Sequence, residues 1–216
     1  MFIGHDALGF ASKRVAPRVS LGWLMAAPSF LDLLWPLFLL LGIEHVRIDP
    51  GNTKFTPLDF YDYPWSHSLL MSIVWGVLFG LAYYMRSRYT VGAVTLAIGV
   101  ISHWVLDFVT HRADMPLYPG GPKVGLGLWN HPQATVIIEA LMFVIGLTIY
   151  IRATQRRDRT GVYALWSFVV VLLIIYAGAA QGTPPPSVNA IIILGFAGYL
   201  IPLWAMWIDR HREARG

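Results

Sequence analysis

The chain has 216 residues, of which 56% are hydrophobic and only 13% are charged, and its mean hydropathy is +0.56. Soluble domains carry about 25% charged residues, so this composition excludes a soluble globule and, more firmly, a disordered chain. Cysteine is absent, which excludes disulfides, thiolate metal sites and cysteine nucleophiles. In a chain this apolar, the net charge of +4 indicates basic loops at a membrane surface rather than a face that binds nucleic acid. We therefore expect an integral membrane protein with no nucleic-acid partner.

Long apolar stretches predict an all-α, polytopic protein with about six transmembrane helices in a single membrane domain, residues 1–216. A helix needs about 20 apolar residues to cross the hydrocarbon core of a bilayer. Six stretches meet this requirement: 19–43, 68–85, 89–109, 134–151, 161–181 and 188–208. The only formally charged side chains within them are Asp32, Asp107 and Glu139. No basic segment with a short apolar core and a cleavage site opens the chain, so we expect no removable signal peptide.

Basic residues are distributed unequally between the two sides of this arrangement. Twelve of the sixteen Lys and Arg residues fall on one side: Lys13, Arg14, Arg18, Arg86, Arg88, Arg152, Arg156, Arg157, Arg159, Arg210, Arg212 and Arg215. The other side receives only Arg47, Lys54, Arg112 and Lys123. By the positive-inside rule we expect both termini in the cytoplasm, and loops 44–67 and 110–133 on the outer face of the cell's inner membrane.

The amino-terminal segment, residues 2–11, is apolar and long enough for a short re-entrant helix. The eight-residue helical rise between His5 and Lys13 would lift His5 about 12 Å from the inner face, towards the depth of Asp32. Such segments are tolerated in membranes where they are buried in protein or face a cavity. We therefore expect a short N-terminal re-entrant helix that carries His5 into the bundle.

The densest polar group lies at the outer end of the third span, where His103, Asp107, Thr110 and His111 follow one another at intervals of four, three and one. Residues three and four apart share one face of a helix, so these side chains form a polar stripe. Imidazole and carboxylate are the ligands that zinc, iron or manganese accept where no thiol is present. A His-x-x-x-Asp pair is thus suited to give two ligands to one metal ion.

Three further polar residues belong to other spans. Asp32 lies in the first span between two prolines that can kink the helix and open a cavity. His67 opens the second span from outside, and Glu139 is five residues into the fourth. Helical rise places His103 about 9 Å, Glu139 about 8 Å and Asp32 about 16 Å below the outer ends of their spans. Side chains from four helices therefore point to one region in the outer half of the membrane.

In these residues the sequence resembles the predicted membrane-bound, metal-dependent hydrolases of bacteria and archaea. The resemblance covers about residues 4–119 and is carried by Gly4-His5, Pro28 with Asp32, Ser66-His67-Ser68-Leu69, Ser102-His103-x-x-x-Asp107-x-x-Thr110 and Pro116-Leu117-Tyr118-Pro119. That family is itself similar to the zinc-dependent phospholipase C and nuclease superfamily, whose helical sites also use a His-x-x-x-Asp pair. The chain departs from the pattern at Asp62, where relatives often have His, and at Leu33 and Leu34 in the first span.

The resemblance implies a cluster of divalent ions, with zinc expected before manganese or iron, that hydrolyses a phosphoester. It implies six candidate metal ligands: His5, Asp32, His67, His103, Asp107 and His111. A carboxylate not used as a ligand, Asp32 or Glu139, would act as the general base. Arg112 and Lys123 in an outer loop would hold the phosphate. The depth of the site indicates a lipid-derived or small phosphoester that enters from the outer leaflet of the surrounding membrane lipid.

Two other classes of protein accommodate the same residues. In an ion- or proton-coupled transporter, or a metal-binding membrane protein without hydrolase activity, Asp32, Asp107 and Glu139 would carry protons or a metal. In a redox protein, the histidines and acidic residues of the helices would bind iron. A haem bound between His67 and His103 would colour the protein. The cytoplasmic halves of the spans lack charged residues, which disfavours transport, and the absence of His-x-x-His clusters disfavours a membrane di-iron hydroxylase.

Overall fold

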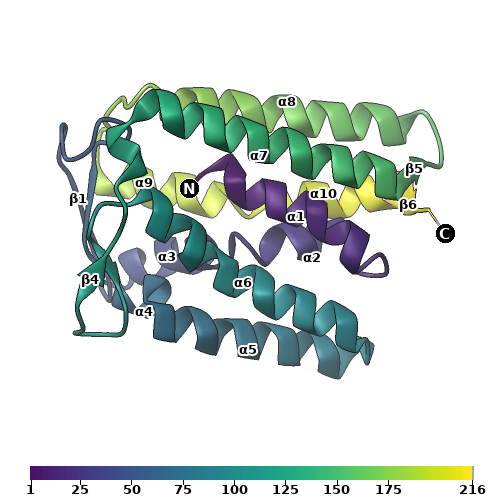
Figure 1. The fold of residues 1–216 in the computed structure, drawn as a ribbon, viewed down its shortest axis with the longest axis horizontal. Helices are drawn as coiled ribbons and strands as arrows, with labels where there is room; N and C mark the ends of the chain where they lie inside the picture. The colour runs from purple at the N-terminus through teal and green to yellow at the C-terminus, as the bar shows by residue number, and fades with distance from the viewer. Residues whose placement is uncertain (216) are drawn as a thin grey trace.

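The structure, a computed structural model, describes residues 1–215. Within that range five helices are long and apolar enough to cross a membrane. They are α5 (Leu69–Ser87), α6 (Thr90–Thr110), α7 (Pro132–Ala153), α8 (Thr160–Ala180) and the stretch Val188–His211, in which a turn separates α9 (Val188–Ala197) from α10 (Leu200–His211). They run along the long axis of the molecule (Figure 1). Five of the six predicted spans and the polytopic all-α class are confirmed.

The sixth prediction, one continuous span over residues 19–43, is wrong. The segment forms two short helices, α2 (Leu21–Ala26) and α3 (Phe30–Leu40), with a turn at residues 27–29. Pro28 lies in that turn and lacks the N–H that an unbroken helix needs there, which accounts for the break. The 11 residues of α3 rise only about 16 Å, half of a hydrocarbon core, so α2 and α3 cross the bundle only in combination.

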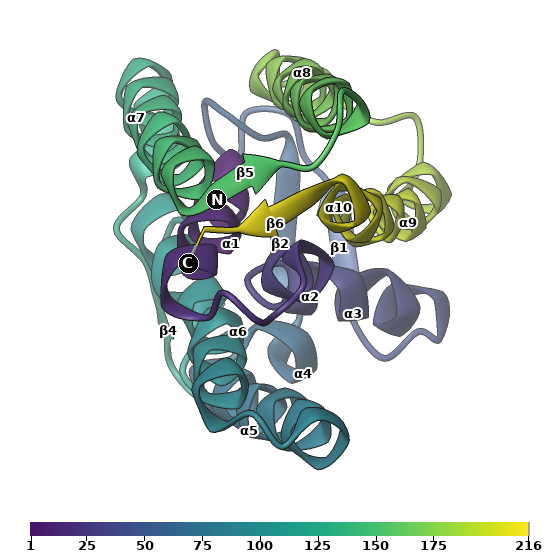
Figure 2. The same cartoon turned by 90° about the vertical axis from the view of Figure 1, so that its right-hand side faces the viewer.

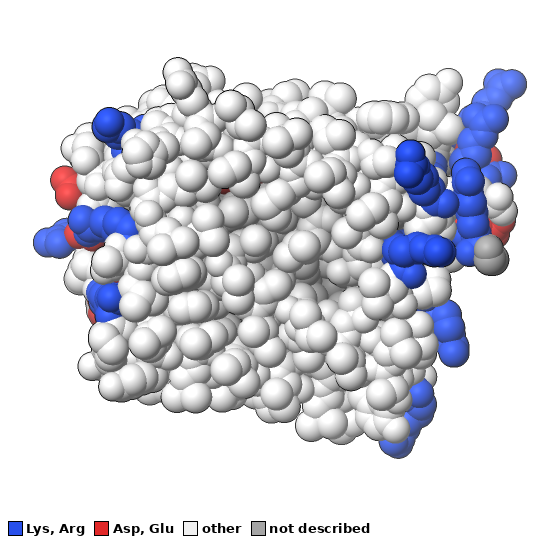
Figure 3. All heavy atoms as spheres, in the orientation of Figure 1, with Lys and Arg blue, Asp and Glu red and all other residues white. Residues whose placement is uncertain are grey.

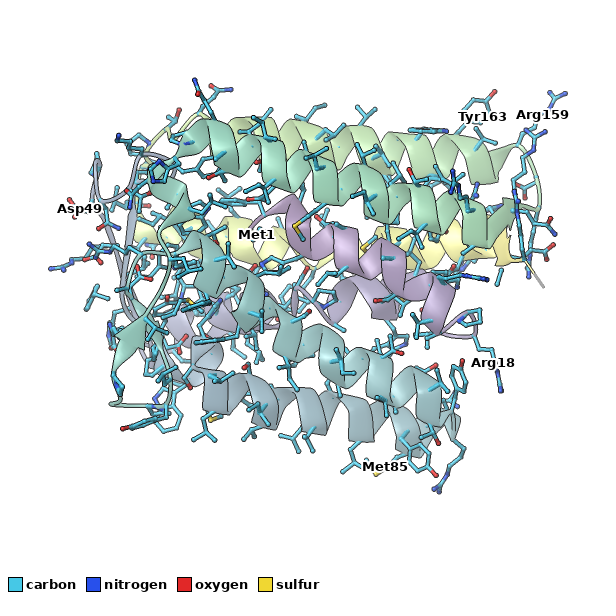
Figure 4. All side chains as sticks on the ribbon, viewed as in Figure 1. Met1, Arg18, Asp49, Met85, Arg159 and Tyr163 are labelled. Atoms are coloured by element: carbon cyan, nitrogen blue, oxygen red, sulfur yellow. The ribbon has the colours of Figure 1, made fainter. Side chains whose placement is uncertain are left out.

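The predicted re-entrant helix is present as α1 (Ile3–Val15). Met1 lies near the middle of the bundle, whereas Arg18 lies at one end of it (Figure 4). Seen from that end, α1 is surrounded by other helices (Figure 2). Phe10 is fully buried and its ring contacts those of Phe143 on α7 and Phe168 on α8, at centroid distances of 5.9 and 6.1 Å. Because lipid is as apolar as these rings, close packing rather than transfer from water holds α1 in place.

The two ends of the bundle differ in structure. At one, which we call the hairpin end, β1 (His45–Ile48) pairs with β2 (Leu58–Asp62), β3 (Met115–Pro116) pairs with β4 (Lys123–Val124), and the short helices α4 (Pro64–His67) and η1 (Leu128–Asn130) complete the loops. At the other, the basic end, β5 (Thr154–Arg156) pairs with β6 (Arg212–Ala214).

Charged side chains gather at the two ends, and the middle of the visible face is almost entirely uncharged (Figure 3). Exposed apolar side chains such as Leu141 and Val170 cover this middle zone, as the lipid-facing surface of a membrane protein requires. Most of the visible Lys and Arg lie at the basic end. Assignment of that end to the cytoplasm stays a prediction. For the N-terminal part of the chain, the prediction applies to residues 13–18, which lie at the basic end. Met1 itself is buried inside the bundle.

Candidate functional site: a buried histidine and aspartate cluster

Helix α6 supplies the centre of the candidate site. His103 is completely buried, and its Nε2 atom lies 3.1 Å from Oδ2 of Asp107 one helical turn later. The i, i+4 spacing read from the sequence therefore produces the expected side-chain pair. Gly99, one turn before His103, lies against Ala27, so this side of α6 packs closely on the α2–α3 break.

The first residue group around this pair contains His5, His103 and Asp107, all of them buried. Nε2 of His5 lies 3.1 Å from Oδ1 of Asp107, and the ring of His5 stacks on that of His103 with centroids 4.0 Å apart. The amino group of Met1 also contacts Oδ1 of Asp107. The two oxygens of this carboxylate thus face different partners, and α1 delivers His5 to the cluster as expected.

The second residue group contains Asp32, His67 and His103. Nε2 of His67 lies 3.3 Å from Nε2 of His103 and 3.4 Å from Oδ1 of Asp32, and Nε2 of His103 lies 3.8 Å from the same oxygen. Asp32 comes from α3 and His67 from α4, so helices far apart in the sequence meet at His103. The break in the first span contributes to this arrangement, because the chain becomes helical again as α3 directly after the break, and α3 carries Asp32.

Hydrogen bonds on the far side of each ring fix how two of these imidazoles face the centre. Nδ1 of His103 donates to the carbonyl oxygen of Pro28 at 2.7 Å. The hydroxyl of Ser66 donates to Glu44 and accepts from Nδ1 of His67, both at 2.6 Å. When Nδ1 carries the proton of a neutral imidazole, Nε2 presents a lone pair. When both imidazoles are neutral, the facing Nε2 atoms of His67 and His103 are therefore both acceptors, and a cation or an added proton has to lie between them.

The distances agree with the first possibility. Two nitrogen ligands about 2.0–2.1 Å from a tetrahedral zinc ion lie about 3.3–3.4 Å from each other, because a tetrahedral angle separates them. The Nε2 atoms of His67 and His103 are 3.3 Å apart, and Asp32 adds an oxygen at 3.4 Å from the first of them. Metal-ligating histidines commonly donate their other ring N–H to a carbonyl or a carboxylate-linked group. Donor type, spacing and supporting hydrogen bonds all fit a metal ion.

Glu44 is a functional candidate that sequence reasoning missed. It is buried, and besides Ser66 Oγ its carboxylate accepts the backbone N–H groups of Trp65 and Ser66, each at 2.7 Å. Burial raises the pKa of Glu44, while the hydrogen bond donated by the Ser66 hydroxyl opposes that rise. Glu44 fixes the start of α4 and so the position of His67. Its only signal in the sequence is an acidic residue directly after an apolar span, which is too common to be specific.

His111 joins the cluster from the end of α6. Its Nε2 lies 3.7 Å from Oδ2 of Asp107, and its Nδ1 lies 3.0 Å from Oδ1 of Asp114. The hydroxyl of Tyr63 lies 3.3 Å from both Nδ1 of His111 and Oδ1 of Asp114. Burial, followed by the negative charge of Asp114, raises the pKa of Tyr63 well above its ordinary value, so this phenol stays protonated. Asp114 and Tyr63 are further residues that the sequence did not single out.

Glu139 occupies a different position from the six ligand candidates. Its Oε2 accepts the backbone N–H groups of Phe2 at 2.8 Å and Gly4 at 3.2 Å, at the start of α1. Its Oε1 is buried and has no hydrogen-bond partner among residues 1–215. These contacts make Glu139 the group that holds the first turn of α1, and with it His5, at the cluster.

The structure does not bring Arg112 and Lys123 to the cluster. The guanidinium of Arg112 pairs with Asp59 at 2.6 Å and with Asp114 at 3.3 Å, and Nζ of Lys123 donates to the carbonyl oxygen of Tyr61 at 2.6 Å. Both residues line a separate hollow at the surface of the hairpin end. Their role in holding a phosphate stays a prediction.

Together, the fold and this cluster define a polytopic helical membrane protein with a buried residue group able to hold a metal ion. The sequence pattern of the YdjM inner membrane protein family matches residues 64–183, more than half of the chain, and the chain belongs to this family. It is therefore an inner membrane protein. No characterised protein and no solved structure matches the sequence.

The family match bears on the site as well as on the class. The matched segment contains His67, His103, Asp107 and His111, while His5 and Asp32 precede it. The membrane-protein part of the resemblance found in the sequence is thereby confirmed. The family description states neither a metal nor a reaction, so both belong to the proposal that follows.

Proposed function

We propose that this protein is a membrane-embedded, metal-dependent hydrolase of a lipid-like phosphoester. The observation that carries the proposal is the pair of facing acceptors, Nε2 of His67 and Nε2 of His103, 3.3 Å apart and bordered by carboxylate oxygens. Ionisable groups in a membrane cost about 2.5–3.5 kcal/mol each on insertion scales, so such a cluster has to be compensated. A divalent cation, zinc before manganese or iron, compensates both the lone pairs and the negative charges.

The ligands divide between two positions. His67, His103 and Oδ2 of Asp107 would hold the first, and the carboxylate of Asp32 adjoins it. One Nε2 atom ligates one ion, so His103 belongs to this position alone. Oδ1 of Asp107 and His5 face each other, and they would hold a second ion once the amino group of Met1 moves away from this oxygen. His111 lies at the edge of the cluster, beside Oδ2 of Asp107.

When bound, divalent ions lower the pKa of water and neutralise charge that develops on a phosphoryl oxygen. The residues of the chain then have separate tasks. Asp32 is the best-placed general base, because its carboxylate lies beside the ligand histidines and is 51% exposed to the adjoining cavity. Glu139 is the second candidate for this role through its unpaired Oε1. Arg112 and Lys123 would act on substrate only after release from their present partners.

Metal content and hydrolysis of detergent-purified protein, prepared without chelators, test the proposal. We expect at least about one equivalent of zinc or manganese per chain, and its loss in His103→Ala/Asp107→Ala protein that still inserts into membranes. The metal-loaded protein in vesicles should release phosphate or a phosphorylated headgroup from phospholipids, and the double variant should not. Full metal occupancy in the double variant would overturn the site assignment.

The alternatives give different results in the same experiments. Bound metal that crosses the vesicle membrane, without any hydrolysis, would favour a transporter. Iron with visible colour would favour redox chemistry. Protein that binds no metal at all would leave His67 and His103 to share a proton, and the hydrolase proposal would fail.

A further inference from the structure

A cavity of about 290 Å³ adjoins the cluster on the side of the last three helices. His5 and Asp32, two of the ligand candidates, also line this cavity, so it is continuous with the proposed reaction site. Its opposite wall is apolar and comes from α8, α9 and α10: Leu172, Ile175, Leu194, Gly195 and Ile201. One space therefore joins the charged centre to an apolar surface.

The mouth of this cavity opens to the side of the bundle. Ile175 on α8 and Leu194 on α9 line it and are 54% and 67% exposed. Both lie on membrane-spanning helices, about 8 and 9 Å below the hairpin ends of α8 and α9 by helical rise. At this depth the surroundings are the acyl chains of one leaflet rather than water. What enters through the mouth thus comes from the bilayer.

The inner end of the cavity is polar and incompletely satisfied. The half-exposed carboxylate of Asp32 lies there, about 12 Å below the hairpin end of α3. Two buried polar atoms of cavity-lining residues, Nδ1 of His5 and the hydroxyl of Tyr176, have no hydrogen-bond partner in the part of the chain that the structure describes. Buried polar groups are normally hydrogen-bonded, so these atoms indicate a ligand with oxygen acceptors.

We propose that this cavity binds a membrane phospholipid that enters sideways between α8 and the α9–α10 pair. One acyl chain lies along Ile175, Leu194 and Ile201, and the ester and phosphate oxygens accept hydrogen bonds from the unpaired Tyr176 hydroxyl and Nδ1 of His5. A volume of about 290 Å³ is at the lower limit of the ~300–1,000 Å³ typical of small-molecule sites, so it holds one chain segment while the rest of the lipid stays in the bilayer. The identity of this lipid as a substrate rests on the proposed function; its binding does not.

Photo-crosslinking tests the binding directly. The full-length protein is reconstituted into phospholipid vesicles that contain a phosphatidic acid with a diazirine in the middle of one acyl chain, and labelled peptides are located by mass spectrometry. We expect labels on the segments 172–176 and 194–201. The double variant Ile175→Trp/Leu194→Trp places two large side chains at the mouth. We expect about tenfold less label on these segments, because loss of the burial of about two methylene groups of the acyl chain weakens binding by about that factor.

The chain provides a closely matched control. Ile174 and Ile193 are neighbours of the two mouth residues, are 65% and 68% exposed, and do not line the cavity. Ile174→Trp/Ile193→Trp protein should therefore be labelled like the unmodified protein. Equal labelling of the two double variants, or labels confined to side chains outside the cavity, would overturn the proposal.

Tyr176→Phe tests the polar end without filling the cavity. It removes a hydroxyl that has no partner within residues 1–215, so the protein should keep its thermal stability and lose label several-fold. Tyr150→Phe, which changes a buried tyrosine outside the cavity, should keep the label. Unchanged labelling in Tyr176→Phe would remove this residue from the site.

The same measurement on His103→Ala/Asp107→Ala protein separates this inference from the proposed function. Label that persists while metal is lost supports the lipid site independently of hydrolysis. Metal binding and phospholipid hydrolysis without label in the cavity would leave the proposed function standing and overturn the lipid site.

Discussion

Two of the regions in which the protein buries charged side chains differ in how far the chain itself balances them. Near the basic end, Nζ of Lys13 lies 3.2 Å from Oδ1 of Asp209 and donates to the carbonyl oxygen of Val19 at 2.7 Å. The other oxygen of Asp209 accepts the backbone N–H of Leu21. Each charge there has an opposite partner, and each oxygen has a donor.

The cluster around His103 is balanced only in part, because the amino group of Met1 contacts Oδ1 of Asp107 and the remaining groups have no such cation. The Nε2 atoms of His67 and His103 face each other, next to the carboxylates of Asp32 and Asp107. An arrangement that only joined helices would pair donors with acceptors, as Lys13 and Asp209 do. The comparison teaches that the burial of charged side chains does not by itself indicate a functional site. An excess of hydrogen-bond acceptors around one point does indicate such a site.

The largest effect is expected from removal of the ligand that the two residue groups share. His103→Ala should lower metal affinity more than about 100-fold, since loss of even an outer hydrogen-bond partner commonly costs 10–100-fold. Ser102→Ala is the matched control, because among residues 1–215 the hydroxyl of Ser102 donates only to the carbonyl oxygen of Gly99 within α6. Metal titration followed by mass spectrometry measures both, and similar affinities would refute the assignment.

The balanced pair should show the opposite behaviour. Lys13→Met leaves Asp209 largely buried without its cation, so we expect a loss of about 3 kcal/mol in stability and a lower Tm, with unchanged metal content. Replacement of both charges, in Lys13→Met/Asp209→Leu, should recover most of the Tm. Thermal unfolding in detergent tests this, and metal loss in Lys13→Met would remove the distinction between the two regions.

An intermediate effect is expected from the hydrogen bond that orients His67. Ser66→Ala removes the acceptor for Nδ1 of His67, so metal affinity should fall about 10–100-fold while the ligands themselves stay in place. Ser72→Ala changes another buried serine, whose hydroxyl donates only to the carbonyl oxygen of Leu69 in the described part of the chain, and should leave the affinity unchanged. Equal affinities in the two variants would show that Ser66 does not position His67.

The smallest effect belongs to an exposed pair at the basic end. The hydrogen bond between Asp158 and Nδ1 of His211, 2.8 Å long, lowers the pKa of the Asp158 carboxyl. A lowered folded-state pKa gives stability that is present above the ordinary carboxyl pKa and is lost as pH falls through the lowered value. Asp158→Asn should therefore lower Tm slightly at pH 7, and the difference should shrink as pH falls below the ordinary carboxyl pKa of 3.8. A pH series of Tm measurements checks this, and an equal difference at all pH values would contradict it.

Local sequence pattern predicted much of the fold and the centre of the site. The lengths of the apolar stretches predicted six spans, five of them correctly, because a helix must satisfy its own backbone in lipid over a fixed thickness. The i, i+4 spacing of His103 and Asp107 determined that their side chains meet, since helical geometry alone sets that distance. Total hydrophobicity, by contrast, could not show that Pro28 divides the first span, because a proline can either kink a helix or end it.

The sequence by itself determined the class of this protein, its long membrane helices and the pair on α6, all of which depend on neighbours within a few turns. Only the tertiary structure decided that His5 and Asp32 reach His103, that Glu44 orients His67 through Ser66, and that Arg112 and Lys123 stay outside. Those outcomes depend on how helices separated by up to about a hundred residues pack together. The packing of α1 among its neighbours sets these distances, and no periodicity within a single segment records it.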